Sequence, residues 1–320
     1  MVAIINQFIG IVVSIMQVLL SVALSFGIVT PPANDQPIVF KDSENVKMSA
    51  VIYADTHTRN TAFNPYFLEC GFEDINNSEE EFDAFVIAGD ITEMGDEGSY
   101  QIIWDAIAEA DCFDTVLLAT GNHDIRFTYE YNTDMIMSKQ SEYIGQEIDK
   151  PYYSYDVNGY TFIVLGSDAW QFEKAIISDE QLAFLDSELA RATKDGKPAF
   201  VVCHQPLANT HGLPEVWQNG DLGADSEEVK AILMKYENVF FLNGHLHDGV
   251  YEKSLEVFDA EKGVYSINLP AYGKDNDYGP FSQTGLGVYV EVYDDEVVFT
   301  ARDFQAGKAL EGYSRSFDIK

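Results

Sequence analysis

The chain alternates between short apolar runs and segments with helical periodicity. Strands are predicted where apolar residues run without polar alternation, at residues 46–54, 82–88, 115–119, 199–203 and 239–242. Helices are predicted between them at residues 98–110, 178–195 and 226–236. Ser178 and Gln181 have the spacing of a capping box, and Gly196 would end that helix.

The remaining predicted strands follow one another without helices between them. Residues 152–165 form two alternating runs around Asn158 and Gly159, which predicts a β-hairpin. Further strands are predicted at residues 264–269, 287–292, 297–301 and 314–319, separated by turns. Together the elements predict an α/β fold, a two-sheet β-sandwich flanked by helices, with the loops that follow the strands at one edge.

Residues 1–29 contain no charged side chain and are predicted to be a hydrophobic leader. From Gln7 onward its few polar or small residues recur every three or four positions, which places them on one helix face. A cleaved signal peptide, a retained membrane anchor and a membrane-surface helix all fit this segment, and a buried helix of the domain is the alternative. Residues 30–45 begin with a Pro-rich stretch and are predicted to be a linker, which leaves residues 46–320 as one domain.

Composition narrows the choice of partners. The net charge of −34 at pH 7 disfavours nucleic-acid polymers, because 19 lysines and arginines cannot supply a basic binding surface. The leader favours export, with the protein secreted or held at a membrane through residues 1–29. A cytoplasmic protein is the alternative, because no basic residue flanks the leader.

Five of the six histidines stand in short polar blocks that directly follow predicted strands. The blocks are Asp55 to His57, Gly89 with Asp90, Gly121 to Asp124, Cys203 to Pro206 and Gly244 to His247. Imidazoles, carboxylates and one carboxamide gathered at strand ends are typical ligands of divalent Mn, Fe or Zn. They are too many for one ion, so two metal ions are expected.

The order of these blocks resembles the calcineurin-like metallophosphoesterase superfamily over residues 46–301. Gly89 to Glu93 (GDITE) and Gly121 to Asp124 (GNHD) resemble the class III cyclic-nucleotide phosphodiesterases within it. The Asp-Arg-Gly sequence of protein Ser/Thr phosphatases and the metal-binding tyrosine of purple acid phosphatases are absent from the corresponding positions. The resemblance implies the αββα sandwich of that superfamily.

The resemblance also implies a role for each ligand. One ion would be held by Asp55, His57 and His247, the second by Asn122, His204 and His245, and Asp90 would bridge them. A bridging carboxylate can hold two such ions about 3.5–4 Å apart, and water shared by them becomes acidic enough to act as a hydroxide nucleophile. His123 would stabilise or protonate the leaving oxygen.

Each of the remaining candidates has a structural alternative, which is the favoured one for His211, Tyr272 and Tyr278. Glu93 is either the partner that orients His123 or an ordinary loop carboxylate. Arg59 and Arg126 either contact the substrate phosphate or pair with nearby carboxylates. His211 either lines the substrate pocket or is a loop residue. Tyr272 and Tyr278 either stack on a ring of the substrate or pack within the domain.

The sequence therefore predicts a metal-dependent phosphoesterase that acts on a small phosphoester, favouring a phosphodiester or nucleotide-type substrate. The alternatives are a phosphomonoesterase or pyrophosphatase acting on nucleotides or sugar conjugates, and a tethered binding module that retains its metals without turnover.

Overall fold

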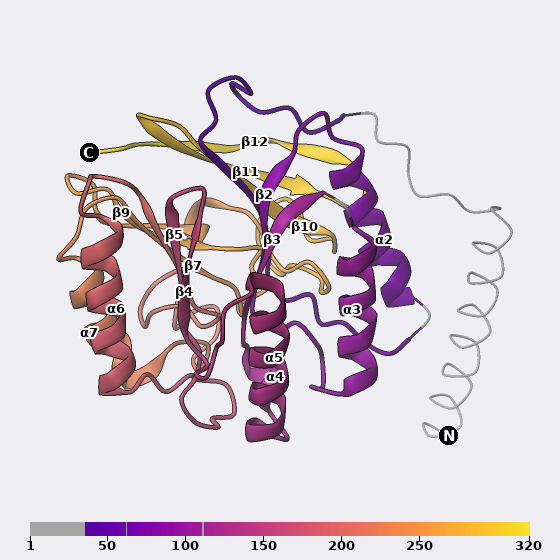
Figure 1. Cartoon of the computed structure of the whole chain (residues 1–320), viewed down its shortest axis with the longest axis horizontal. Helices are drawn as coiled ribbons and strands as arrows, with labels where there is room; N and C mark the ends of the chain where they lie inside the picture. The colour runs from indigo at the N-terminus through magenta and orange to yellow at the C-terminus, as the bar shows by residue number, and fades with distance from the viewer. Residues whose placement is uncertain (1–35, 62, 111) are drawn as a thin grey trace, which may run out of the picture.

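The computed structural model describes residues 36–320 except residues 62 and 111, so the predicted leader lies outside the described part of the chain. Two six-stranded mixed sheets face each other (Figure 1). The first has the order β12 (Lys308–Asp318), β11 (Glu296–Asp303), β10 (Leu286–Val292), β1 (Met48–Tyr53), β2 (Phe82–Ala88) and β3 (Phe113–Ala119). The second has the order β4 (Tyr153–Val157), β5 (Tyr160–Val164), β6 (Ala199–Val202), β7 (Val239–Asn243), β9 (Val264–Asn268) and β8 (Leu255–Asp259).

Helices cover the outer faces of both sheets (Figure 1). The first sheet is covered by α2 (Phe63–Asn76) and α3 (Glu97–Glu109), and the second by α6 (Asp179–Ala192) and α7 (Ser226–Leu233). The short α4 (Asn122–Ile125) and the longer α5 (Tyr129–Ile144) follow β3. The 3₁₀-helices η1 (Gly223–Asp225) and η2 (Glu252–Ser254) precede α7 and β8. The predicted αββα sandwich is confirmed.

The alternation of side chains along β1 shows how the layers are filled. Met48, Ala50 and Ile52 point into the core between the sheets, whereas Val51 and Tyr53 point into the core beneath the outer helices. All five are fully buried. A strand covered on both faces is apolar at nearly every position, and the exception in β1, the buried Ser49, donates its hydroxyl to the Glu81 carbonyl.

Parallel strands place the polar blocks at one edge. β1, β2 and β3 are parallel neighbours in one sheet, and β6 and β7 are parallel neighbours in the other. The carboxyl ends of parallel strands lie on the same side of a sheet, so the loops that follow these five strands meet where the two sheets face each other.

Several local expectations need correction. Ser178 accepts a hydrogen bond from the Gln181 backbone, but the Gln181 side chain bonds Gly166 and Asp168 instead of closing a capping box. Helices α2 and α5 and strand β8 were not predicted.

The domain also includes part of the segment assigned to the linker. Ile38 and Phe40 are buried, and the Phe40 ring packs edge-on against Phe82 with centroids 5.2 Å apart. The hairpin at Asn158 and Gly159 forms as predicted, with positive φ at both residues. Within the residues that the structure describes, no helix is both long and apolar enough to span a bilayer.

Candidate functional site

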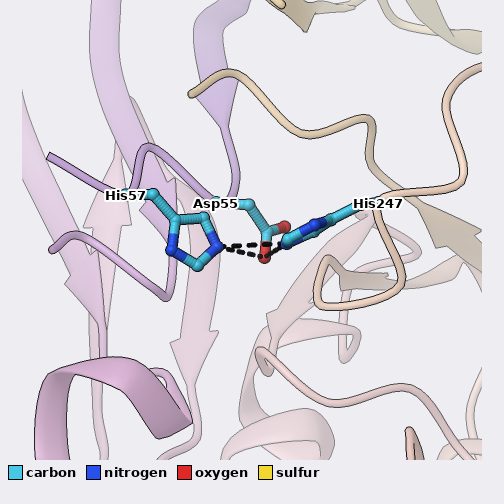
Figure 2. Close-up of side chains that lie close together, drawn as sticks. All are labelled: Asp55, His57 and His247. Atoms are coloured by element: carbon cyan, nitrogen blue, oxygen red, sulfur yellow. Dashed lines mark hydrogen bonds and ion pairs between the residues drawn. The ribbon is translucent and has the colours of Figure 1, made fainter. Parts of the chain in front are cut away.

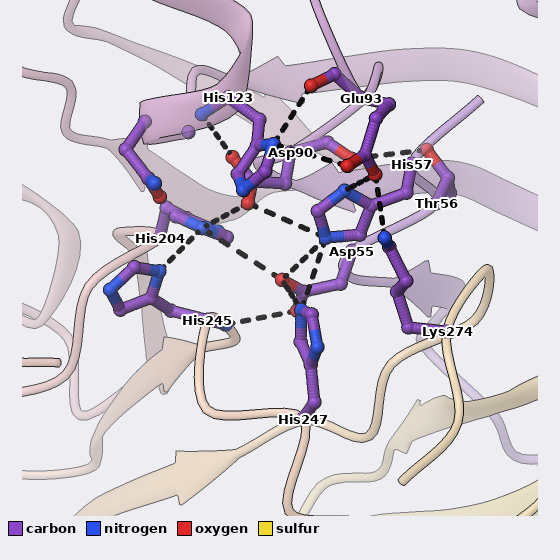
Figure 3. Close-up of polar contacts among 12 residues, drawn as sticks. Asp55, Thr56, His57, Asp90, Glu93, His123, His204, His245, His247 and Lys274 are labelled. Carbon is purple, nitrogen blue, oxygen red and sulfur yellow. Dashed lines mark hydrogen bonds and ion pairs between the residues drawn. The ribbon is translucent and has the colours of Figure 1, made fainter. Parts of the chain in front are cut away.

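The polar blocks converge into one cluster of side chains between the two sheets (Figure 3). Asp55 and His57 follow β1, Asp90 follows β2, and His204, His245 and His247 follow β6 and β7. The backbone has positive φ at Asp55, His57, Asp90, His245 and His247. Each such residue costs of the order of 1–3 kcal/mol, and strain of this kind is concentrated at functional sites.

Asp55, His57 and His247 form the first potential metal-binding group (Figure 2). The two imidazole Nε2 atoms lie 3.1 Å apart. The Asp55 Oδ1 atom lies 3.0 Å from Nε2 of His247 and 3.8 Å from Nε2 of His57. Three ligand atoms from two loops, 190 residues apart in sequence, therefore point at one position.

Asp90, His204 and His245 form the second group, and all three are buried. The Asp90 Oδ2 atom lies 3.2 Å from His204 Nε2, which in turn lies 3.2 Å from His245 Nδ1. His204 Nδ1 donates a hydrogen bond of 2.9 Å to the Ala88 carbonyl. That bond turns Nε2 towards the cluster, as the outer partners of metal-binding histidines do.

Asp90 links the two groups. Its Oδ2 atom is 3.6 Å from Nε2 of His57 in the first group, besides its contact with His204 in the second. The structure therefore brings together five of the predicted ligands, Asp55, His57, His204, His245 and His247, and places Asp90 in contact with both groups.

The chemistry of the donor set fits bound metal ions. The Asn122 Nδ2 group donates to Glu173 Oε2 at 2.8 Å, while its Oδ1 atom is buried without a hydrogen-bond partner. The Nε2 atom of His245 is also buried without a partner. Buried polar atoms are rarely left unsatisfied, so the orphaned Asn122 oxygen, on a residue that lines the same cavity as Asp90, fits a site built for a cation. The orphaned nitrogen of His245 is not the one that faces the cluster, because His245 meets His204 through Nδ1.

The ionisation states of the clustered side chains follow from their burial and from the charges of their neighbours. Burial raises the pKa of Asp55, but His247 and His204 more than offset it and lower that pKa to about 2. Burial lowers the pKa of His204, but Asp90 and Asp55 more than offset it and raise that pKa to about 10. The pKa of His245 is lowered well below its usual range by burial and by the charge of His204. The carboxylates are therefore held ionised, which is the form that binds metal.

Two glycines allow the carboxylates to approach the backbone. A Cβ at Gly121 would lie 2.1 Å from Asp90 Oδ1, and one at Gly244 would lie 2.5 Å from Asp55 Oδ2. The same Oδ1 of Asp90 accepts the His123 backbone N–H at 2.8 Å, and the same Oδ2 of Asp55 accepts the His245 backbone N–H at 2.9 Å. Each carboxylate is thereby held through one oxygen, which leaves the other for the cluster.

His123 is oriented by Glu93, although not by its carboxylate. The Nδ1 atom of His123 donates to the Glu93 backbone carbonyl at 2.8 Å, while the nearest carboxylate oxygen is 3.9 Å away. The carboxylate instead lies 2.9 Å from Nδ1 of His57, 2.7 Å from Lys274 and 3.1 Å from Arg59. Burial raises the Glu93 pKa, but His57 and Lys274 more than offset it, so the carboxylate remains ionised.

The three substrate-contact candidates lie in different places. The Arg126 guanidinium is 3.1 Å from Nε2 of His123 and 3.3 Å from Glu173. Arg59 pairs with the Glu93 carboxylate, which contacts Nδ1 of His57, whereas the other ring nitrogen of His57, Nε2, faces His247. His211 does not line the pocket. It is fully buried, and its ring bonds the Lys253 carbonyl and the Ser266 hydroxyl.

The two candidate aromatic residues, Tyr272 and Tyr278, lie in different environments. Tyr272 is buried and stacks on Tyr53 with ring centroids 4.2 Å apart, so it packs within the domain. Tyr278 lines a cavity of about 300 Å³ beside the cluster. The cavity is also lined by the predicted ligands Asp90, Asn122, His245 and His247 and by His123, Glu173, Val216, Trp217, Leu246 and Asp277.

Sequence reasoning missed residues that shape the site. Asp124 is buried and accepts the backbone N–H groups of Ile91, Thr92 and Gly121 at 2.9–3.1 Å, which ties together the loops after β2 and β3. Burial and the neighbouring Asp90 raise its pKa to about 6. Its place in the same block as His123 could have indicated this role. Glu173 and Trp217 lie on long loops, where no pattern singles them out.

The chain is similar in sequence to a known protein. A curated relative, the probable cyclic nucleotide phosphodiesterase of Rhodococcus erythropolis, is 32% identical over 176 residues. That match covers 52% of this chain, and the chain spans about half (51%) of the relative's length.

Solved structures share the fold at low identity. A dimetal phosphatase from Danio rerio has a TM-score of 0.62 at 15% identity, over 86% of this chain and 100% of that one. A purple acid phosphatase from yellow lupin, Lupinus luteus, has a TM-score of 0.59 at 14% identity, over 90% of this chain and 55% of that one. The model of the family described as calcineurin-like phosphoesterase matches residues 48–249. The chain belongs to the calcineurin-like phosphoesterase family.

Proposed function

We propose that this enzyme is a dinuclear metal-dependent hydrolase of a small phosphodiester. The observation that supports this most strongly is the pair of ligand groups that share Asp90 beside a cavity lined by His123. A volume of about 300 Å³ is suited to a small ligand. The acidity of the chain disfavours a nucleic-acid polymer as substrate.

The ligand assignment follows the two groups. Asp55, His57 and His247 would hold one ion, Asn122, His204 and His245 the other, and Asp90 would be shared. When bound, the two ions would acidify water to supply the nucleophile and would neutralise charge on the phosphoryl oxygens.

The chain's own groups would then manage the leaving oxygen. His123 has Nδ1 fixed by the Glu93 carbonyl and Nε2 beside Arg126, in the wall of the cavity. The Arg126 N–H donates to Nε2, so that nitrogen is an acceptor in the structure. Once Arg126 turns to the phosphoryl group, Nε2 would be free to take up a proton and to give it to the departing alkoxide. Arg126, which lies between His123 and Glu173, would hold the phosphoryl group through a charged hydrogen bond.

The test begins with protein stripped of metal and reloaded with Mn²⁺, Fe²⁺ or Zn²⁺. We expect two equivalents of bound metal by mass spectrometry, and turnover of bis(4-nitrophenyl) phosphate that exceeds turnover of 4-nitrophenyl phosphate. A preference for the monoester would favour the phosphomonoesterase alternative. Metal binding without turnover of either ester would favour the binding-module alternative.

A matched control separates the shared carboxylate from acidic residues in general. Asp90→Asn should lose metal and activity, whereas Asp105→Asn, on the exposed side of α3, should keep both. Equal behaviour of the two variants would contradict the assignment of Asp90.

We also propose that residues 1–29 direct export or hold the domain at a membrane. The support is the uncharged apolar sequence, whose exposure on a soluble protein would be costly. Fractionation of cells that express the full chain, followed by N-terminal sequencing of the product, tests this. A cytoplasmic product that still begins at Met1 would refute it.

A further inference from the structure

Two aromatic rings from separate loops line the cavity beside the metal-ligand cluster. Trp217 is half-buried, and its ring centroid lies 4.7 Å from that of His245. Tyr278 is 41% exposed and stacks on Tyr251 at a centroid distance of 6.0 Å. Both side chains therefore present part of their ring surface to the cavity instead of burying it.

The positions of both rings are fixed by their surroundings. A Cβ at Gly220 would lie 2.7 Å from Trp217 Cε3, so only glycine leaves room for the indole there. The Tyr278 backbone N–H donates to the Asp248 carbonyl at 3.0 Å, and the preceding N–H donates to the His247 carbonyl at 2.7 Å. The backbone of the tyrosine loop is thus bonded directly to the loop that carries His247, which fixes where the Tyr278 side chain leaves the main chain relative to the cluster.

The charged side chains around the cavity limit how many phosphate groups a bound substrate can carry. Glu173 and Asp277 line it, and no lysine or arginine does so among the described residues. Lys274 and Arg59 line a different cavity, on the His57 side, and both contact Glu93. Arg126 pairs with Glu173 beside the cavity and is assigned above to the reacting phosphoryl group, so a second or third phosphate would meet Asp277 and Glu173 without a further cation in the wall to neutralise it.

We propose that Trp217 and Tyr278 form a subsite that stacks on an uncharged planar ring, a nucleobase or an aryl group, in a substrate with a single phosphoryl group. This proposal rests on the proposed function, since the phosphoryl group would occupy the metal-ligand cluster. It specifies the substrate further: a ring-bearing phosphodiester, in preference to a nucleoside polyphosphate.

A binding experiment tests the subsite without turnover. The probe is 1,N6-ethenoadenosine, a fluorescent nucleoside without phosphate, and its anisotropy is measured with the metal-loaded enzyme. Stacking of one base is worth roughly a tenfold change in affinity or more. We expect Trp217→Leu and Tyr278→Leu each to weaken binding about tenfold, and Trp217→Phe to retain most of it. Tyr131→Leu removes an exposed tyrosine outside the cavity and should change nothing.

The outcomes distinguish this proposal from the proposed function. Equal binding by all variants, or no binding to the wild-type enzyme, overturns the subsite even if phosphodiesters are hydrolysed. Binding that depends on Trp217, in a protein that hydrolyses no phosphoester, supports the subsite and refutes the proposed function.

A kinetic experiment tests the same subsite with phosphodiester substrates. Phenyl 4-nitrophenyl phosphate and ethyl 4-nitrophenyl phosphate share a leaving group and differ in whether the second ester group is a ring. Trp217→Leu should raise KM about tenfold for the phenyl ester alone, with kcat little changed. ATP should be hydrolysed with a kcat/KM at least about 100-fold below that of the phenyl ester. An unchanged preference between the two diesters, or efficient ATP hydrolysis, would overturn the proposal.

Discussion

His211 offers a quantitative test of how the interior of the domain responds to acid. Its imidazole is fully buried, and burial lowers its pKa from 6.5 to about 4. Nδ1 donates to the Lys253 carbonyl at 2.8 Å, and Nε2 accepts from the Ser266 hydroxyl at 2.9 Å. Both bonds suit the neutral ring. The Glu256 carboxylate contacts the His211 backbone N–H at 3.0 Å, and among the described residues no carboxylate bonds the ring itself.

The sign follows from proton binding. Because the folded-state pKa lies below the unfolded value, the unfolded chain binds more protons at acidic pH. The stability contributed by neutral His211 is complete above about pH 6.5 and is lost as the pH falls towards 4. A pKa difference of about 2.5 corresponds to about 3 kcal/mol in all, of which about 2 kcal/mol is lost by pH 5.

The assay compares urea unfolding of the wild type and His211→Asn at pH 8 and pH 5, with a chelator present. Asparagine accepts the φ of +51° at this position but does not titrate. We expect the variant to be less stable at pH 8 and the difference to shrink by about 2 kcal/mol at pH 5, because all other titrating groups are common to both proteins. Parallel losses of stability in the two proteins would refute the reasoning.

Further predictions concern the site. Asp90→Asn should abolish nearly all metal binding and hydrolysis, measured by mass spectrometry and phosphodiester turnover, and wild-type rates would refute the dinuclear assignment. His123→Ala should keep its metal while kcat falls about 10²–10⁴-fold, more for poor leaving groups, and equal losses for all leaving groups would contradict the acid role. Gly121→Ala should weaken metal binding about 10–100-fold in a folded protein, since its Cβ would lie 2.1 Å from Asp90 Oδ1, so an unchanged titration would count against this packing. Glu93→Gln should weaken metal binding about tenfold without changing the dependence on leaving group, and an altered leaving-group dependence would show that its carboxylate serves His123.

The buried strands and the polar residues that follow them could both be predicted. Burial on both faces requires the strand to be apolar, so the polar ligands stand in the loop after it. A strand covered on both faces needs an almost unbroken apolar run, as in residues 82–88, which form β2 with the predicted bounds and include one charged residue, Asp83. A ligand can then stand just beyond that run, as Asp90 does after Gly89. The strand pattern and the polar blocks therefore predicted the same edge of the sandwich.

The elements that escaped prediction lack such a pattern. Helix α2 has Gly71 in its interior, where glycine is unfavourable, and Pro65, a residue common in turns, in its first turn, so its sequence resembles a loop. Strand β8 lies at the edge of its sheet and is only partly buried, with Val257 52% exposed. Its apolar residues therefore do not form a run, and tertiary contacts determine its conformation.

Parts of the site could not be predicted because they depend on contacts between distant loops. Glu173 pairs with Arg126 and Asn122 across about 50 positions of sequence, and Trp217 meets His245 from a loop without periodicity. His211 stands near a ligand block in sequence, but its loop turns into the interior beneath β9. Proximity in sequence was the only reason to place it in the pocket.

Glu93 shows where the limit of sequence reasoning lies. The resemblance singled out this residue as the partner of His123, and the structure does place it there, but through its backbone carbonyl. The carboxylate is directed at His57 and is held by two cations. A backbone contact depends only on the path of the loop, so any residue could supply it, whereas the contact with His57 requires the acidic side chain. An acidic residue at position 93 is therefore explained by a metal ligand, and replacing it should affect metal binding before it affects the leaving group.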